Sequence, residues 1–173
     1  LELIEALHLF SVSYKDIEVL VHPEAIIHSM VEFLDGVILA QMSVADMRIP
    51  IQYSLTYPDR LSNGYNQVDF LKLKSLNFRR PDFSKFPCLE LAYKAASQGE
   101  TMPCVLNAAN EISVSAFLNG RIRFTDIPRV IEKVMRRHKV FSKSSLPDIL
   151  GADSWARREA STIIGRLKSK CLI

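Results

Sequence analysis

The sequence predicts an α+β fold: part of a mixed α/β domain that contains a β-hairpin, followed by a C-terminal domain built like a four-helix bundle. Two β-rich runs flank Asp35-Gly36, a dipeptide typical of tight hairpin turns. Residues 58–81 are rich in proline and turn residues, as in a linker. Apolar residues then recur at helical spacing in four separate stretches. We therefore divide the chain into residues 1–57, which include the hairpin, a linker over 58–81 and a helical domain over 82–173.

The first residues form an amphipathic helix. Its apolar residues fall on one face at helical spacing: Leu3, Ile4, Leu7 and Phe10. Polar residues interrupt any apolar run that a signal peptide would need, namely Glu2, Glu5 and His8. Because the pattern starts with no N-cap before it, we expect that the chain was cut just before Leu1 and is the carboxy-terminal part of a longer protein.

The β-structure is predicted from three short runs. Ile17–Val21 is a β-rich run that a proline soon follows, so a short strand is expected there. His28–Leu34 and Val37–Ser43 are expected to pair through a type I′ turn at Asp35-Gly36. Both faces of this hairpin are apolar, which requires cover on both, from helices on one side and a partner subunit on the other. Pro50 is well placed to open a helix that runs through Tyr57.

Four helices are predicted after the linker. The first two are Cys88–Ser97, which Gly99 ends, and Cys104–Leu118. The third has Thr125 as its N-cap, and the fourth is expected to follow Asp153 or Ser154. Their mostly short connections favour a small bundle.

The composition is that of an ordinary globular protein, with 48% hydrophobic and 24% charged residues. No apolar run approaches the roughly 20 residues of a membrane span, so no membrane partner is expected. Three cysteines without a CxxC pair favour free thiols in a reducing compartment: Cys88, Cys104 and Cys171. The net charge of +3 includes a basic run at Arg129–Lys139, which we interpret as a solvated helix face and not as a nucleic-acid site.

Several catalytic motifs are missing from the sequence. The six glycines are scattered and make neither a GxGxxG fingerprint nor a phosphate-binding loop, so no nucleotide cradle is expected. No serine lies in a nucleophile elbow, and no HExxH zinc motif occurs. On its own, the chain lacks a full catalytic set.

Three groups of polar residues are candidates for chemistry. Glu2 lies in the first turn of the opening helix. The helix dipole stabilises a carboxylate there, so Glu2 can also be a solvated side chain without a chemical role. His22 and His28 are six residues apart, which disfavours paired metal ligation, although either can line a cleft or fill a core. A third group interrupts an otherwise small and apolar helix and is expected to hydrogen-bond across the bundle or to a neighbouring domain: Asn107, Asn110 and Glu111.

Several motifs, taken together and in this order, closely resemble those of the 1-deoxy-D-xylulose 5-phosphate reductoisomerase family. The match extends from Leu1 to the last predicted helix. The motifs are Val21-His22-Pro23-Glu24, Ile27-His28-Ser29-Met30-Val31, Ala40-Gln41, Asp46-Met47-Arg48-Ile49-Pro50, Phe86-Pro87-Cys88 and Leu106-Asn107-Ala108-Ala109-Asn110-Glu111-Ile112.

This resemblance implies an NADPH-dependent, metal-binding oxidoreductase and isomerase of non-mevalonate isoprenoid biosynthesis. Its sugar-phosphate substrate, 1-deoxy-D-xylulose 5-phosphate, becomes 2-C-methyl-D-erythritol 4-phosphate, with Mn²⁺ or Mg²⁺ as the metal. The resemblance also implies a homodimer, in the bacterial cytoplasm or in a plastid. Residues 1–57 would then be the second half of the catalytic and dimerisation domain, 58–81 the linker and 82–173 the C-terminal helical domain. The upstream portion of the same enzyme would be a further partner of this chain and would bind most of the NADPH. No cofactor-binding residue is expected in the chain itself.

The resemblance also implies roles for three residues. Glu2 matches a glutamate that ligates the metal, and it is therefore the expected catalytic, metal-binding and substrate-binding residue. Met47 matches a residue close to the substrate, and His28 matches a histidine just outside the substrate contacts. Ser43-Val44-Ala45 departs from the Gly-Glu-Pro that is frequent in the family.

A hard divalent cation prefers oxygen ligands, but one carboxylate cannot hold it alone. The isolated chain is therefore expected to be inactive. The alternative function is a folding or dimerisation module without chemistry, which the two apolar faces of the predicted hairpin favour.

Overall fold

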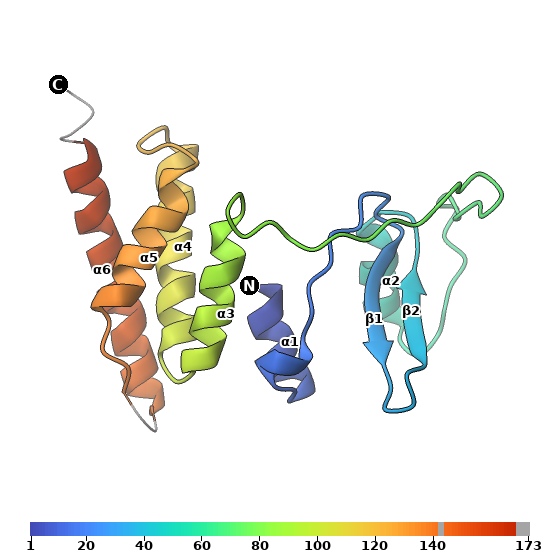
Figure 1. Cartoon of the computed structure of the whole chain (residues 1–173), viewed down its shortest axis with the longest axis horizontal. Coiled ribbons are helices and arrows are strands. Elements are labelled where there is room, and N and C mark those ends of the chain that lie inside the picture. The colour runs from blue at the N-terminus through green and yellow to red at the C-terminus, as the bar shows by residue number, and fades with distance from the viewer. Residues whose placement is uncertain (142–143, 169–173) are drawn as a thin grey trace. The chain divides into compact units, whose positions relative to one another are not determined.

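The computed structural model describes residues 1–141 and 144–168, and the chain divides into two compact units. Unit 1 contains residues 1–18 together with the described residues from 82 onward, and unit 2 contains residues 19–81. The α-helices and the strands of both units are labelled in Figure 1. In the described part of the chain, the structure is mostly helical with one two-stranded antiparallel sheet, which confirms the α+β class in this coarse form. No described helix is long and apolar enough to cross a membrane.

Unit 1 is helical. It consists of α1 (Glu2–Phe10), a short 3-10 helix (Tyr14–Asp16), α3 (Pro87–Gln98), α4 (Met102–Leu118), α5 (Asp126–Arg137) and α6 (Leu146–Lys168). Helix α4 packs against α3, α5 and α6, and α1 packs against α3. The contact between the first residues of the chain and α3 includes a hydrogen bond of 3.0 Å from the Tyr93 hydroxyl to the Ile17 carbonyl. The opening helix thus joins the helical unit, while the division at residues 57 and 81 stays a prediction.

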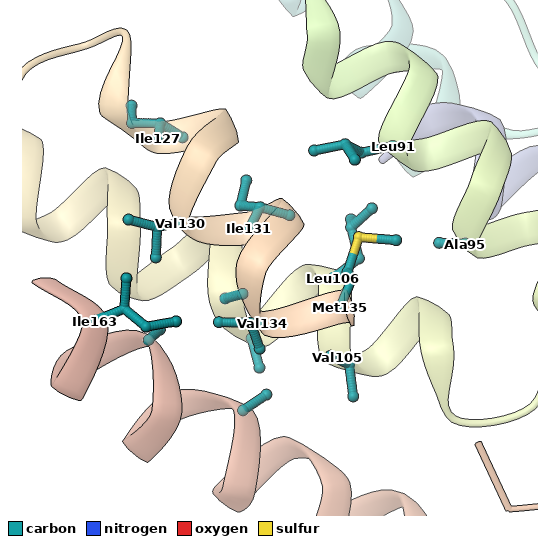
Figure 2. Packing of buried hydrophobic residues seen from close by; sticks show 14 of the residues in the cluster. Leu91, Ala95, Val105, Leu106, Ile127, Val130, Ile131, Val134, Met135 and Ile163 are labelled. Carbon is teal, nitrogen blue, oxygen red and sulfur yellow. The ribbon is translucent and has the colours of Figure 1, made fainter. Parts of the chain in front are cut away.

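The core of unit 1 combines small residues on α4 and α6 with branched residues on α5. Ala108 and Ala109 on α4 and Ala156 on α6 have no exposed surface, which lets the helix backbones approach closely. Figure 2 shows branched side chains of α5, such as Val130 and Val134, directed into the space shared with α4 and α6. Because both sets of residues are fully buried, this core accounts for most of the hydrophobic stabilisation in the described chain.

Helix α6 begins at Leu146, seven residues before Asp153, so the predicted start after Asp153 or Ser154 was wrong. Its first turn is stabilised by Ser145, whose backbone N–H and hydroxyl donate to Asp148 Oδ2 at 2.9 and 2.6 Å. Pro147 fits the first turn, where its missing N–H costs no helical hydrogen bond. This capping-box arrangement, Ser-x-x-Asp, was the local signal for the true start.

Unit 2 contains the predicted hairpin, with β1 (Ile27–Glu32) antiparallel to β2 (Ile38–Met42), and then α2 (Arg48–Thr56). The turn is not type I′. The Phe33 N–H donates to the Val37 carbonyl at 2.8 Å, which encloses a three-residue loop. Gly36 has a φ of 83°, but Asp35 is not among the residues with positive φ, and a type I′ turn needs both.

The predicted strand at Ile17–Val21 does not form. Only Val21 pairs, in an isolated bridge with Arg79, and the two residues exchange hydrogen bonds of 2.8 and 2.9 Å. A strand needs a neighbouring strand to satisfy its backbone hydrogen bonds. Among the described residues, only Arg79 pairs with this run.

Unit 2 has little core of its own. Every buried hydrophobic residue of the described chain lies in unit 1, whereas Val31 of β1 and Leu39 of β2 are 57% and 61% exposed. The predicted cover of the hairpin by helices is therefore not provided by the described residues of unit 2. An isolated two-stranded hairpin is marginally stable, so unit 2 has apolar surface that remains to be buried.

Candidate functional site

Glu2 is the first residue of α1 and is exposed. Helix α1 is held in unit 1 by Leu3, which is 5% exposed, and by its packing against α3. The carboxylate of Glu2 has no hydrogen bond or ion pair with any other residue in the described ranges. It is therefore an oxygen donor on a fixed helix, available to a ligand.

The metal chemistry expected at Glu2 needs several oxygen donors around the ion. Within residues 1–141 and 144–168, no group of three or more His, Cys, Asp or Glu side chains could hold a metal ion. Mg²⁺ takes about six oxygen ligands in near-octahedral geometry. Glu2 can therefore supply one oxygen to such an ion, and no cluster of acidic, His or Cys side chains in the described ranges completes the set.

His28 lies on β1 at a local irregularity of the hairpin. The pairing register shifts between Ile27 and Ser29, on either side of it. Its Nε2 lies 3.1 Å from the Ser43 carbonyl, and because a carbonyl only accepts, Nε2 carries the proton and donates. Irregularities of this kind often lie next to active sites and redirect a side chain.

Met47 lies just before α2 with 72% of its surface exposed. Its neighbours form a tight ion pair: the Arg48 guanidinium donates to Asp46 Oδ2 at 2.6 Å and holds the pKa of that carboxyl at about 2. The same guanidinium stacks over the Tyr65 ring at 4.3 Å. The apolar side chain of Met47 and the paired guanidinium of Arg48, whose side chain is 67% exposed, are therefore both open to solvent here.

The polar group of α4 joins this helix to α6. The Asn107 amide donates to Glu111 Oε1 at 2.9 Å, and Glu111 Oε2 pairs with Arg157 at 2.8 Å. Hydrogen bonds from Arg157 and Asn107 hold the pKa of Glu111 below its usual range. The prediction of hydrogen bonding across the bundle is confirmed for Glu111, which reaches Arg157 on α6, whereas the bond from Asn107 stays within α4. Arg157, which also pairs with Asp153 at 2.8 Å, was missed by sequence reasoning.

Asn110 faces a different surface. It lines a cleft of about 590 Å³ between α3, α4 and α5, together with apolar side chains that include Leu91, Val114 and Phe124. Burial raises the pKa of the Cys88 thiol, which also lines this cleft, and so keeps it protonated. None of the three residues expected at the active site lines this cleft.

Two of the three expected site residues lie in the same unit. His28 and Met47 both belong to unit 2, and the hydrogen bond from His28 ends on Ser43, four residues before Met47. Glu2 belongs to unit 1. Each of the three assignments stays a prediction.

The chain is thus of the α+β class. It combines a helical unit that has its own core with a small hairpin unit that has none. Comparison with known proteins identifies the family. Residues 42–159 match the model of the DXP reductoisomerase C-terminal domain. The chain is 53% identical over 165 residues to the 1-deoxy-D-xylulose 5-phosphate reductoisomerase of Heliobacterium modesticaldum, and 54% identical over 164 residues to that of Acetivibrio thermocellus. The chain belongs to the DXP reductoisomerase family.

The alignments cover 95% of this chain but 42% and 43% of these two relatives, so the chain spans less than half their length. A structure of the enzyme from Zymomonas mobilis in complex with NADPH matches with a TM-score of 0.84 and 45% identity, over 94% of this chain and 43% of that one. A DOX-P reductoisomerase in complex with NADPH, fosmidomycin and magnesium matches with a TM-score of 0.85 and 39% identity, over 96% of this chain and 43% of that one.

Proposed function

We propose that this chain is the C-terminal part of an enzyme that converts 1-deoxy-D-xylulose 5-phosphate to 2-C-methyl-D-erythritol 4-phosphate with NADPH, in non-mevalonate isoprenoid biosynthesis. The observation that carries the proposal is the identity of 53–54% to named reductoisomerases over 95% of the chain. The complexes of related structures with NADPH and magnesium support the same cofactors here, with Mn²⁺ as the alternative metal.

Glu2 is the proposed metal ligand. Its carboxylate supplies one oxygen and is positioned by α1, whose packing against α3 fixes the helix. A bound Mg²⁺ or Mn²⁺ would hold substrate oxygens and polarise the carbonyl group during the rearrangement. In unit 2, the exposed side chain of Met47 provides an apolar surface against the substrate, and His28, oriented by Ser43, supports the contacts around it.

NADPH is proposed to bind mainly to the portion of the enzyme that this sequence does not contain, because the chain has no glycine-rich phosphate loop. In the same proposal, residues 1–57 complete the catalytic and dimerisation domain, 58–81 form the linker and 82–173 the C-terminal helical domain. The exposed apolar faces of β1 and β2 support a homodimer. The proposed location is the bacterial cytoplasm or a plastid.

A chimera tests the proposed activity. In it, this chain replaces the matching part of the Heliobacterium modesticaldum enzyme. We expect the chimera to oxidise NADPH in a reaction that requires both 1-deoxy-D-xylulose 5-phosphate and Mn²⁺. The 173-residue chain alone should neither bind NADPH nor turn over substrate. A folded chimera without activity, beside an active parent enzyme, would contradict the proposal.

Glu2→Gln in this chimera tests the metal site. We expect kcat to fall by at least about 100-fold, because even the outer partners of metal ligands contribute 10–100-fold. The affinity for Mn²⁺ should fall with it. Glu5→Gln is the matched control, since Glu5 lies in the same first helical turn and carries the same charge. A near-normal rate and metal affinity in the Glu2→Gln variant would remove Glu2 from the site.

The second candidate function is a folding or dimerisation module without chemistry. It is favoured by the lack of any buried hydrophobic residue in unit 2. Sedimentation of the chain alone distinguishes it: a monomer at high concentration argues against an interface built on the hairpin.

A further inference from the structure

Two segments of unit 2 that are far apart in the sequence are joined by a clamp, formed by residues 21–24 and residues 75–79. The Glu24 carboxylate accepts two hydrogen bonds from Asn77: one from its backbone N–H at 3.1 Å and one from its side-chain amide at 2.5 Å. These bonds hold the pKa of Glu24 below its usual range. The amide of Asn77 also donates to Ser75 Oγ at 2.9 Å.

His22 adds a third contact to Asn77. Its side chain is 7% exposed, and its ring stacks on Phe78 with centroids 4.8 Å apart. The Nδ1 atom lies 2.8 Å from the Asn77 carbonyl and 3.0 Å from Glu24 Oε2. Both partners only accept, so Nδ1 carries the proton. Asn77 therefore uses its backbone N–H, its carbonyl and its side chain to bind one short turn that lies 53 residues earlier.

The clamp holds a turn with an uncommon backbone conformation. The Ala25 N–H donates to the His22 carbonyl at 3.1 Å, and Ala25 has a φ of 50°, in the left-handed region that a residue with a Cβ seldom adopts. Such conformations persist only where the surrounding contacts hold them. The contacts of Asn77 with His22 and Glu24, on the two sides of Pro23, provide this restraint.

The turn leads directly to His28. The carbonyl of Ile26 accepts from the Ser43 N–H at 3.0 Å, the pairing register shifts between Ile27 and Ser29, and His28 Nε2 donates to the Ser43 carbonyl. The irregular start of the hairpin is thus held on one side by Ser43 and on the other by the clamped turn.

We propose that Asn77 is a positioning residue for the reaction: by binding Glu24 and His22 it fixes the turn before β1 and, through that turn, the orientation of the His28 ring. This inference rests on the proposed function. Asn77 does not touch the reacting atoms. It acts from the connecting segment on the geometry of the site.

Asn77→Asp in the chimera breaks the clamp, because it replaces a donor by a carboxylate beside that of Glu24. We expect kcat to fall by about 10-fold, since small misplacements of groups at a site can lower rates by up to about 100-fold. The KM for NADPH should stay within twofold of the parent value, because NADPH binds elsewhere.

Adding Glu24→Gln to Asn77→Asp should restore most of the lost kcat. The glutamine amide can donate to the new carboxylate, which recreates the pair with the roles exchanged. Asn66→Asp is the matched control, since Asn66 is an exposed asparagine of the same segment with the same change of charge. Thermal melting of each variant checks that it is folded.

An NMR measurement on ¹⁵N-histidine-labelled protein is independent of activity. The Nε2–H signal of His28 should change in Asn77→Asp and return in the double variant, whereas Asn66→Asp should match the parent. If Asn77→Asp does not fold, the single variant Glu24→Gln is measured instead. A glutamine side chain has one acceptor oxygen, whereas the Glu24 carboxylate uses two for Asn77, so Glu24→Gln should also lower kcat and change the His28 signal.

Two results would overturn the inference: parent-like kcat and His28 signals in the folded Asn77→Asp variant, or a double variant as impaired as Asn77→Asp. If Glu24→Gln is the variant measured, a kcat and a His28 signal like those of the parent would likewise overturn the inference. An inactive parent chimera would instead contradict the proposed function, and the His28 signals would still test the clamp.

Discussion

His138 lies at the end of α5, where its ring meets two other parts of unit 1. Its Nε2 is 2.7 Å from the Thr101 hydroxyl, which is fully buried, and its ring centroid is 5.2 Å from that of Trp155 on α6. The neighbouring Arg137 is paired with Glu159. Burial lowers the pKa of His138 below its ordinary value of 6.5. The unfolded chain therefore takes up a proton at this residue more readily than the folded chain does.

This difference predicts a loss of stability on acidification. The contribution of neutral His138 is complete above pH 6.5 and is lost as the pH falls through the lowered pKa of the folded state. The melting temperature of the chain, measured from pH 7.5 to 5.5, should fall more steeply for the parent than for His138→Gln, which cannot titrate. His8→Gln is the control, because His8 is an exposed histidine on α1. Equal slopes for the parent and His138→Gln would contradict the prediction.

At the scale of elements, the contact between α4 and α6 contains two kinds of interaction side by side. Ala156 of α6 has no exposed surface and lies in the core cluster. The next residue, Arg157, is partly exposed and binds Glu111 and Asp153 from the rim of the same contact. Close packing and an exposed ion pair thus act at adjacent positions on one helix.

Substitutions at these two positions should differ in their effects. Ala156→Leu should lower the free energy of unfolding by about 1–3 kcal/mol, because added volume in a close-packed core forces its neighbours apart. Arg157→Gln should cost less, since an exposed ion pair contributes about 1 kcal/mol or less. Urea unfolding of the chain, followed by circular dichroism, measures both. A larger loss in Arg157→Gln than in Ala156→Leu would show that the ion pairs, and not the packing, hold α6 on α4.

At the scale of the whole molecule, the two units differ in what stabilises them. Unit 1 contains all the buried hydrophobic residues of the described chain, whereas the strands of unit 2 are mostly exposed. Local stability follows buried apolar contacts, so the two units should open with different free energies. The clamp at Asn77 ties segments of unit 2 together but does not replace a core.

Hydrogen exchange tests this difference. In the chain alone, backbone amides of α4, α5 and α6 should exchange slowly and those of β1 and β2 rapidly. In the chimera, β1 and β2 should become protected, because the rest of the enzyme can bury their apolar faces. Strong protection of β1 and β2 in the chain alone would show that unit 2 is stable without those additional contacts.

Local signals predicted most of the secondary structure. The hairpin around Asp35-Gly36 is present, and Gly99 ends α3 with a φ of 66°, as expected of a glycine after a helix. The start of α6 was missed, although Ser145 and Asp148 carried a short-range signal for it. The strand at Ile17–Val21 failed for a different reason, since pairing depends on a partner that local composition does not reveal.

The sequence by itself determined the family, through the identity and order of its motifs, and most of the helices of unit 1, through their short-range periodicity. The candidates Glu2, His28 and Met47 follow from the resemblance to the family and stay predictions. Only the tertiary structure decided that α1 packs against α3, that Arg157 pairs with Glu111, and that Asn77 binds the turn at His22 and Glu24. Each of these contacts joins residues far apart along the chain. Such pairs form when the packing of whole elements brings their side chains within hydrogen-bond or van der Waals distance, and no pattern within a short stretch of sequence records that distance.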